Sequence, residues 1–241
     1  MVAPLCFFVL VSTSSGALDE ALEATEPPRT LRAAFTVELT SDKASRVFDF
    51  DPRAPEGGRW RLVEAVGEDG DLDQAASIWG AEPAPDGRLF PDDLRPSFGQ
   101  AVEVDDKGLA WQIDFRHRPS ANDTEFDKWA IERLSASAWL DPATNRFLRL
   151  DYSLPAPVRG PEGGRLTKFD QSWFLETEPT YGLSVVTAFS IDVEARAGFK
   201  TITRGYSAQV TRAELFFSSD EAEAEFLSSQ LDAPGQATSP R

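Results

Sequence analysis

Apolar and polar residues alternate most regularly between residues 130 and 193. Every second residue is apolar in the stretch 148–154, and a longer alternating stretch runs from Leu183 to Val193. A period of two is typical of β-strands that pack one face on a core and expose the other. Asp141–Asn145 precedes the first stretch and suits a tight turn, because Pro142 fixes φ and Asn145 tolerates a left-handed conformation. We therefore predict an antiparallel meander whose buried face includes Leu148, Leu150, Trp173, Val185, Phe189 and Ile191.

The same alternation, read over the rest of the chain, predicts about ten strands and two or three short helices. Strands that alternate and are joined by short Gly- and Pro-rich turns pair mainly antiparallel. The sequence therefore predicts a mainly β protein with one sheet-dominated domain. Outside the meander, the expected strands are residues 31–39, 47–50, 60–63, 102–104, 111–115, 199–203 and 209–216.

One long segment, Gly67–Gly99, breaks the strand pattern. It predicts a short helix at Ala75–Trp79, for which Asp71 or Asp73 is a suitable N-cap. Prolines divide the remainder into turns, with one more helical turn expected near Asp92–Leu94. An irregular insert between strands often covers a sheet face or rims a pocket. We expect this insert to form a lid.

The two ends of the chain differ from its middle. Residues 1–17 resemble an export signal, with an apolar run at Val2–Val11 and small residues before a cleavage site near Ala17. The run is shorter than the roughly 20 residues that span a bilayer. It lacks a basic residue in front, so a buried N-terminal strand or helix is the alternative. The expected organisation is a signal (1–17), a linker (18–30), a β domain (31–217), a short helix (218–231) and a disordered tail (232–241).

Cysteine usage bears on the compartment. Cys6 is the sole cysteine and lies inside the expected signal. A chain cleaved after Ala17 would hold no disulfide and no thiolate site. An exported domain without disulfides fits a bacterial periplasm better than an animal secretome. We expect a periplasmic or secreted protein with no integral membrane segment in the mature chain.

The formal net charge of -16 disfavours two classes of partner. Nucleic acids and anionic lipid headgroups are both bound through basic patches, and no Lys/Arg cluster stands out along the sequence. The simplest role of so acidic a surface is to keep the protein soluble. We expect no nucleic-acid partner.

Catalytic and metal motifs give little support for an enzyme. His117 is the sole histidine, and its neighbours Arg116 and Arg118 oppose the imidazolium that a triad base must form. Asp69, Asp71 and Asp73 have the spacing that opens a calcium loop, but Gln74 and Gly80 stand where such a loop needs Gly and Glu. Capping of the following helix is the alternative. We expect no enzyme, no cofactor and no metal site.

The arrangement of several segments resembles the LolA/LolB-like superfamily. The resemblance rests on the export segment, on Leu31–Phe35, on the strand Trp60–Leu62 with its Gly/Pro-rich insert, and on the hairpin Ala138–Arg146. It covers about Leu31 to Phe216; the long insert and the acidity depart from the lipoprotein carriers. The resemblance implies an incomplete β-barrel, a strongly curved antiparallel sheet whose concave face is closed by a few short helices.

These observations favour a non-catalytic extracytoplasmic binding protein with an apolar concave pocket. Its ligand would be a lipid, an acylated protein or a hydrophobic peptide. The pocket is expected between the lid and the sheet, with the ligand-binding residues Trp60, Ile78, Trp79, Trp111 and Trp173. Alternatively, the same tryptophans fill the core and leave no cavity. A scaffold or assembly protein that uses a sheet edge, and a carboxylate-dependent hydrolase, remain the alternative functions.

Overall fold

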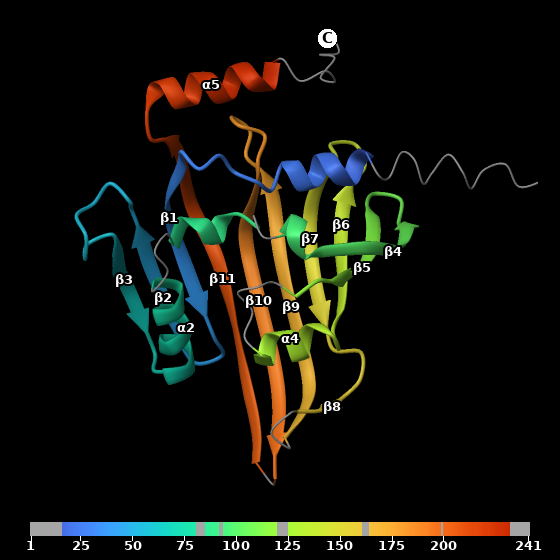
Figure 1. Ribbon diagram of the computed structural model, residues 1–241. Coiled ribbons are helices and arrows are strands. Elements are labelled where there is room, and N and C mark those ends of the chain that lie inside the picture. The colour runs from blue at the N-terminus through green and yellow to red at the C-terminus, as the bar shows by residue number, and fades with distance from the viewer. Residues whose placement is uncertain are drawn as a thin grey trace, which may run out of the picture.

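The computed structural model describes residues 16–80, 85–91, 94–119, 125–160, 164–198 and 200–231. These residues form one open antiparallel sheet of 11 strands in the order β3-β2-β1-β11-β10-β9-β7-β6-β5-β4, with β8 beside β9 (Figure 1). The mainly β, antiparallel fold is therefore confirmed. The strands are β1 (Leu31–Thr40), β2 (Ser45–Phe50), β3 (Trp60–Val66), β4 (Phe98–Asp106), β5 (Trp111–His117), β6 (Ser135–Asp141), β7 (Arg146–Ser153), β8 (Val158–Arg159), β9 (Arg165–Thr177), β10 (Ser184–Ala197) and β11 (Lys200–Phe217).

Helices are short and lie between or beside the strands (Figure 1). Residues 16–23 are helical. The other helices are α2 (Gly70–Gly80), the 3₁₀ helix η1 (Pro85–Leu89), α3 (Leu94–Ser97), α4 (Glu125–Ile131) and α5 (Asp220–Leu231). Within the described residues, none of them has the length and hydropathy needed to cross a membrane.

The core consists of two hydrophobic clusters. The first lies where β1 and β2 meet the insert, and it includes Phe35, Leu72 and Leu89. The second lies under the β5–β7 side of the sheet and includes Ile113 and Phe147. Trp173 on β9 packs against both clusters. Burying a large apolar side chain contributes roughly 1.5–3 kcal/mol, so both halves of the sheet have a substantial core.

The stretch expected as a linker contributes to this core. Residues 16–23 form a helix, and Ala21 and Leu22 are buried in the second cluster. Its end is tied to the sheet, because Ser184 N donates a 2.7 Å hydrogen bond to the carbonyl of Ala24. The small residues of this segment are what allow the helix to lie close to the sheet. Residues 1–15 of the expected signal, and the expected tail, fall outside the described residues.

The sequence predicted two separate strands at residues 199–203 and 209–216, and this was wrong. One strand, β11, contains both residues 200–203 and residues 209–216. β11 runs for 18 residues, and its pairing with β10 continues through the predicted gap, where Arg204 opposes Val193 and Gly205 opposes Asp192. A Cβ at position 205 would lie 3.2 Å from the carbonyl oxygen of Ile191, so a larger residue there would require a small shift of the neighbouring strand. Arg204 and Gly205 interrupted the apolar alternation without interrupting the strand.

Leu148 was predicted on the buried face with Leu150, and this was wrong. Leu150 is buried, but Leu148 is 41% exposed. The register between β6 and β7 shifts at this point: Trp139 pairs with Arg149 and Leu140 pairs with Phe147, so Leu148 is the extra residue of a β-bulge. A bulge reverses the parity of the residues on either side of it. The turn before β7 was predicted correctly, since Asn145 has a φ of 52°.

The lid segment contains the expected helix. Asp69 caps α2, because its Oδ1 accepts a 3.0 Å hydrogen bond from the amide of Asp71. The N-cap is therefore Asp69, and the prediction of Asp71 or Asp73 was wrong, because α2 begins at Gly70 and both of these residues lie inside its first turn. The other two aspartates are paired with arginines, Asp71 with Arg204 and Asp73 with Arg46. The described residues contain no group of three or more metal-ligating side chains, and Asp92 and Asp93 lie outside them.

Candidate functional site

A hollow of about 490 Å³ lies between the β2–β3 hairpin and α2. Its lining is mostly apolar, and it is partly open to solvent. Volumes of this size are typical of small-molecule sites. The lining residues are Arg46, Phe48, Trp60, Leu62, Asp73, Ala76, Ser77 and Gly80.

The apolar wall of the hollow comes from the hairpin. Phe48 on β2 pairs with Leu62 on β3, and Phe50 pairs with Trp60, so these side chains share one face of the sheet. The rings of Phe48 and Trp60 are stacked, with centroids 4.7 Å apart and planes 13° apart. β3 is an edge strand, and Leu62 keeps 50% of its surface exposed. The wall is therefore an aromatic stack with an accessible leucine beside it.

The end of α2 lies directly against Trp60. A Cβ at position 80 would lie 2.5 Å from Cδ1 of the Trp60 indole. Only a glycine therefore lets the indole occupy this position without a shift. Gly80 is the last residue of α2, and it brings the helix end to the mouth of the hollow.

The polar end of the hollow is an ion pair. Arg46 on β2 is 7% exposed, and its Nε donates to Oδ1 of Asp73 at 2.8 Å. Its Nη1 donates to the carbonyls of Ser45 and Val66, at 2.7 and 2.9 Å. One guanidinium thus connects β2, β3 and α2. A buried charge needs such partners, since desolvating an unpaired one is costly.

The five residues predicted for the ligand site lie in different places. Trp60 lines the hollow. Trp79 and Trp173 belong to the packing of the first cluster, and Trp111 packs against the second. Ile78 is 55% exposed, so it does not lie on the underside of α2 as the sequence suggested. The helical period explains this, because Leu72, Ala75, Ala76 and Trp79 share the buried side.

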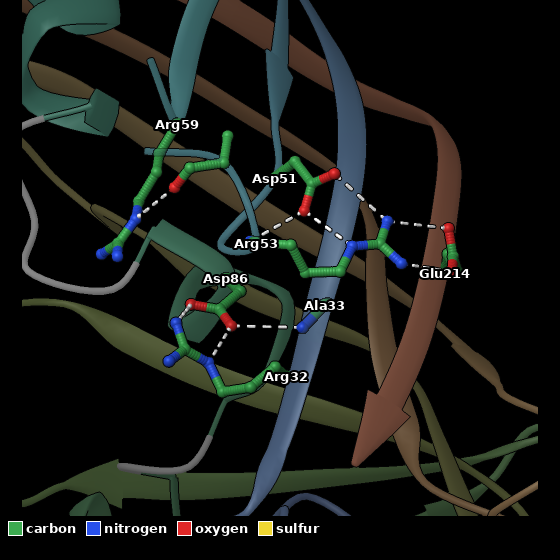
Figure 2. Close-up of polar contacts among 8 residues, drawn as sticks. Arg32, Ala33, Asp51, Arg53, Arg59, Asp86 and Glu214 are labelled. Atoms are coloured by element: carbon green, nitrogen blue, oxygen red, sulfur yellow. Dashed lines mark hydrogen bonds and ion pairs between the residues drawn. The ribbon is translucent and has the colours of Figure 1, made fainter. Parts of the chain in front are cut away.

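Several contacts hold the insert against the sheet. Nε1 of Trp79 donates to the hydroxyl of Tyr206 at 3.3 Å, and the guanidinium of Arg88 lies 5.1 Å from the Trp79 ring centroid. Asp86 on η1 accepts two hydrogen bonds from Arg32 on β1, at 2.7 and 3.0 Å, and one from the amide of Ala33 (Figure 2). The insert therefore covers the first cluster as a fixed layer.

The sole histidine lies outside the hollow. Nδ1 of His117 is 3.2 Å from the hydroxyl of Tyr152, and the two rings meet edge-on with centroids 5.5 Å apart. The lining of the hollow holds one serine, Ser77, whose hydroxyl donates to the backbone carbonyl of Asp73 at 2.9 Å. An aromatic wall and a buried ion pair are suited to holding a ligand.

Sequence reasoning missed Phe48, Leu62 and Arg46 as lining residues. Alternation indicates which face of a strand an apolar residue occupies, but not which neighbouring strand or helix faces it. Residues 47–50 were expected to pair with the strand before them, and the pairing of β2 with β3, which forms this wall, was not predicted. The sequence also does not indicate that Arg46 is buried, because the hydrocarbon stem of an arginine can pack against apolar residues whether or not its charged group is exposed.

No protein-family model and no curated protein matches this sequence. Three solved structures resemble it. A putative outer membrane lipoprotein-sorting protein domain from Vibrio parahaemolyticus has 10% identity and a TM-score of 0.37, covering 92% of this chain and 100% of that one. A LolA superfamily protein from Nitrosomonas europaea has 8% identity and a TM-score of 0.36, covering 86% and 96%. A DUF1329 family protein from Desulfovibrio piger has 10% identity and a TM-score of 0.38, covering 90% and 98%.

These comparisons include the superfamily that the sequence layout resembles. The similarity is one of layout. Identities of 8–10% and TM-scores of 0.36–0.38 carry no argument about a ligand or an activity.

Proposed function

We propose that this chain is a non-catalytic extracytoplasmic binding protein that holds an apolar group in the hollow between β3 and α2. The group would be the acyl chain of a lipid or acylated protein, or an apolar side of a peptide. The observation that carries the proposal is the stacked Phe48–Trp60 wall with the half-exposed Leu62 beside it. The extracytoplasmic compartment rests on the export-like segment before Ala17.

The energetics favour an apolar ligand. Leu62 and Trp60 border a hollow that is partly open to solvent, and covering apolar surface gains roughly 25 cal/mol per Å². The walls are already held in place by the Gly80 contact and by the insert, so little ordering accompanies binding. The polar end, formed by Arg46, Asp73 and Ser77, would orient an amphiphile with its head group toward the ion pair.

The other predicted tryptophans take a supporting part in this proposal. Trp79 lies behind α2 in the first cluster and keeps the helix in place. Trp173 and Trp111 fill core positions. Trp60 is the tryptophan that we assign to direct ligand contact, together with Phe48 and Leu62.

A fluorescent fatty-acid probe tests the proposal. We expect the wild type to bind it with energy transfer from tryptophan, and Leu62→Glu to bind it about tenfold more weakly or worse, because a carboxylate would stand in the apolar wall. Leu148→Glu is the matched control. Leu148 is also an exposed strand leucine but does not line the hollow, so this variant should bind like the wild type.

Absence of probe binding by the wild type, or equal losses in both variants, would refute the proposal. A scaffold role through the edge strand is the alternative that one observation favours. Val63 and Val66 on β3 are more than half exposed, and an unpaired edge strand is a template for another strand. Self-association that Leu62→Glu abolishes, without any probe binding, would support that alternative instead.

A further inference from the structure

β10 and β11 extend past the rest of the sheet, and β9 and β8 flank them there (Figure 1). We call this end of the sheet the ribbon end and define it as residues 158–160, 164–168, 194–198 and 200–204. It is rich in cations although the chain as a whole is acidic. Its charged residues are Arg159, Arg165, Lys168, Arg196, Lys200 and Arg204 against Glu194, with Glu162 in the adjoining loop sequence.

Three of these arginines lie in one row across neighbouring strands. Arg159 on β8 is the register partner of Arg165 on β9, and Arg165 is in turn the partner of Arg196 on β10. Directly opposed residues in an antiparallel pair project from the same face, on strands about 4.8 Å apart. All three are exposed. Like charges placed directly opposite destabilise a sheet, so this row acts against folding.

Little within the described chain neutralises the row. Arg196 has one ion pair, a 3.6 Å contact with Glu194. Two other cations of the ribbon end are already paired, Lys168 with Asp192 and Asp170 and Arg204 with Asp71. Arg159 and Arg165 form no ion pair among the residues that the structure describes. An external anion would therefore relieve the repulsion between the three guanidinium groups.

The opposite face of the ribbon end is also cationic at its tip. Lys200 pairs with Ala197 and so projects from the face that does not carry Arg196. It is exposed, as is Ile202 two residues further on the same face. The tip thus presents cations on both faces, with Ile202 as an exposed apolar side chain. Such a protruding tip suits a flat surface better than a small ion (Figure 1).

An acidic helix lies at the other end of the sheet. α5 follows β11 directly and begins with Asp220, Glu221, Glu223 and Glu225, at the end of the sheet away from the ribbon end (Figure 1). The 18 residues of β11 separate the two ends by about 60 Å, at roughly 3.3 Å per residue. Charges are screened beyond a Debye length of about 8 Å at physiological salt. The acidic end therefore does not cancel the field of the ribbon end.

From the arginine row and this charge separation, we propose that the ribbon end docks on a membrane surface of anionic phospholipid. The row supplies several adjacent cations, which match an array of phosphate head groups, and the acidic opposite end orients the molecule with the ribbon end toward the membrane. The proposal departs from the expectation that the net charge disfavours anionic lipid, because net charge does not describe how charge is distributed. The inference is independent of the proposed hollow.

Vesicle sedimentation tests the proposal with the full-length chain. We expect binding to vesicles of phosphatidylcholine mixed with phosphatidylglycerol, no binding to phosphatidylcholine alone, and weakening as salt is raised. The triple variant Arg159→Gln, Arg165→Gln, Arg196→Gln should bind at least tenfold more weakly. The matched control Arg59→Gln, Arg116→Gln, Arg212→Gln removes three exposed arginines elsewhere and should keep wild-type binding. All these proteins share the same N-terminal segment.

Failure of the wild type to bind anionic vesicles would overturn the proposal, as would equal losses in the two triple variants. Displacement from vesicles by inorganic phosphate, but not by chloride at equal ionic strength, would assign the row to a small anion and likewise overturn it. Binding to polyglutamate without binding to vesicles would assign it to an acidic protein. Circular dichroism of each variant checks that the sheet is intact.

Discussion

Two ion-pair networks drawn in Figure 2 show how strongly burial affects the contribution of an ion pair to stability. Asp86 is 4% exposed and is paired with Arg32 and with the amide of Ala33, which is itself buried. Asp51 and Glu214 share Arg53, and all three side chains are about half exposed. Water competes for both partners of the Arg53 ion pairs, whereas in the Asp86 network it reaches Arg32 but hardly reaches the carboxylate. The two networks should therefore respond differently to the loss of one carboxylate.

Asp86→Ala is expected to destabilise the protein by about 1–3 kcal/mol, because it leaves the buried amide of Ala33 and the Arg32 guanidinium without their acceptor. Asp51→Ala should have no measurable effect on stability, since Arg53 keeps Glu214. Urea unfolding followed by tryptophan fluorescence measures both. Similar midpoints for Asp86→Ala and the wild type would show that η1 is not anchored through this carboxylate.

Tyr181 links pH to the docking of α5. Burial, together with the 2.8 Å hydrogen bond that its hydroxyl donates to Glu223, raises the pKa of Tyr181 from 10.0 to about 12. A raised pKa means that the folded state holds the proton more tightly, so its contribution to stability is complete below pH 10 and is lost as the pH rises toward 12.

We therefore expect the melting temperature of the wild type to fall more steeply between pH 10 and 12 than that of Tyr181→Phe, which has no hydroxyl to ionise. Absorbance of tyrosinate should show a group titrating near 12 that this variant lacks. Parallel stability curves for the two proteins would contradict the prediction. Tyr206 is the internal comparison, because burial also raises its pKa.

At the scale of the strand, the bulge in β7 gives a prediction that separates two leucines. Leu150→Ala should cost roughly 2–5 kcal/mol, since it leaves a cavity in the second cluster. Leu148→Ala should stay within about 0.5 kcal/mol, because its side chain already faces solvent. Denaturant midpoints of the two variants measure both losses of stability. Equal losses would mean that the bulge does not persist in solution.

The same strand shows what alternation can and cannot predict. The pattern located β1, β2, β5 and β6 because most of their apolar residues share one parity. It missed the parity change at Leu148, since a bulge arises from pairing with another strand and leaves no local mark. It split β11 at Arg204, whose partner Asp71 lies on α2. A polar residue that binds a distant partner breaks the apolar alternation, so the sequence pattern at that point resembles a loop.

For the candidate site, the sequence identified a residue of the apolar wall but not the residues of α2 that face it. Trp60 was recognised from its place on a strand beside the insert, and it lines the hollow. Ile78 and Trp79 are adjacent in sequence, yet one is exposed and the other is 2% exposed. The rotation of α2 decides between them, and that rotation is fixed by contacts to Tyr206, Arg46 and Arg204. Those contacts join segments far apart in the chain.

At the scale of the whole molecule, composition and arrangement give different answers about partners. The net charge of -16 describes an acidic protein, whereas the arrangement is an elongated sheet with acids at the α5 end and cations at the ribbon end. The core is also divided, and Trp173 is the residue that touches both clusters. The apolar core thus lies between two ends that carry opposite charges. The membrane docking proposed above would act along the long axis that joins these ends.

The pairing of β1 with β11 places the first and last strands side by side, with Leu31 opposite Phe217. Within the sheet, β1–β3 join the other strands through this pairing. While the chain emerges from a ribosome or a translocation channel, the N-terminal hairpins therefore wait for residues made almost 190 positions later. Closing so long a loop is slow compared with forming a hairpin. The sheet is therefore completed only after β11 has been made, and until then β1–β3 remain apart from the strands to which β11 joins them.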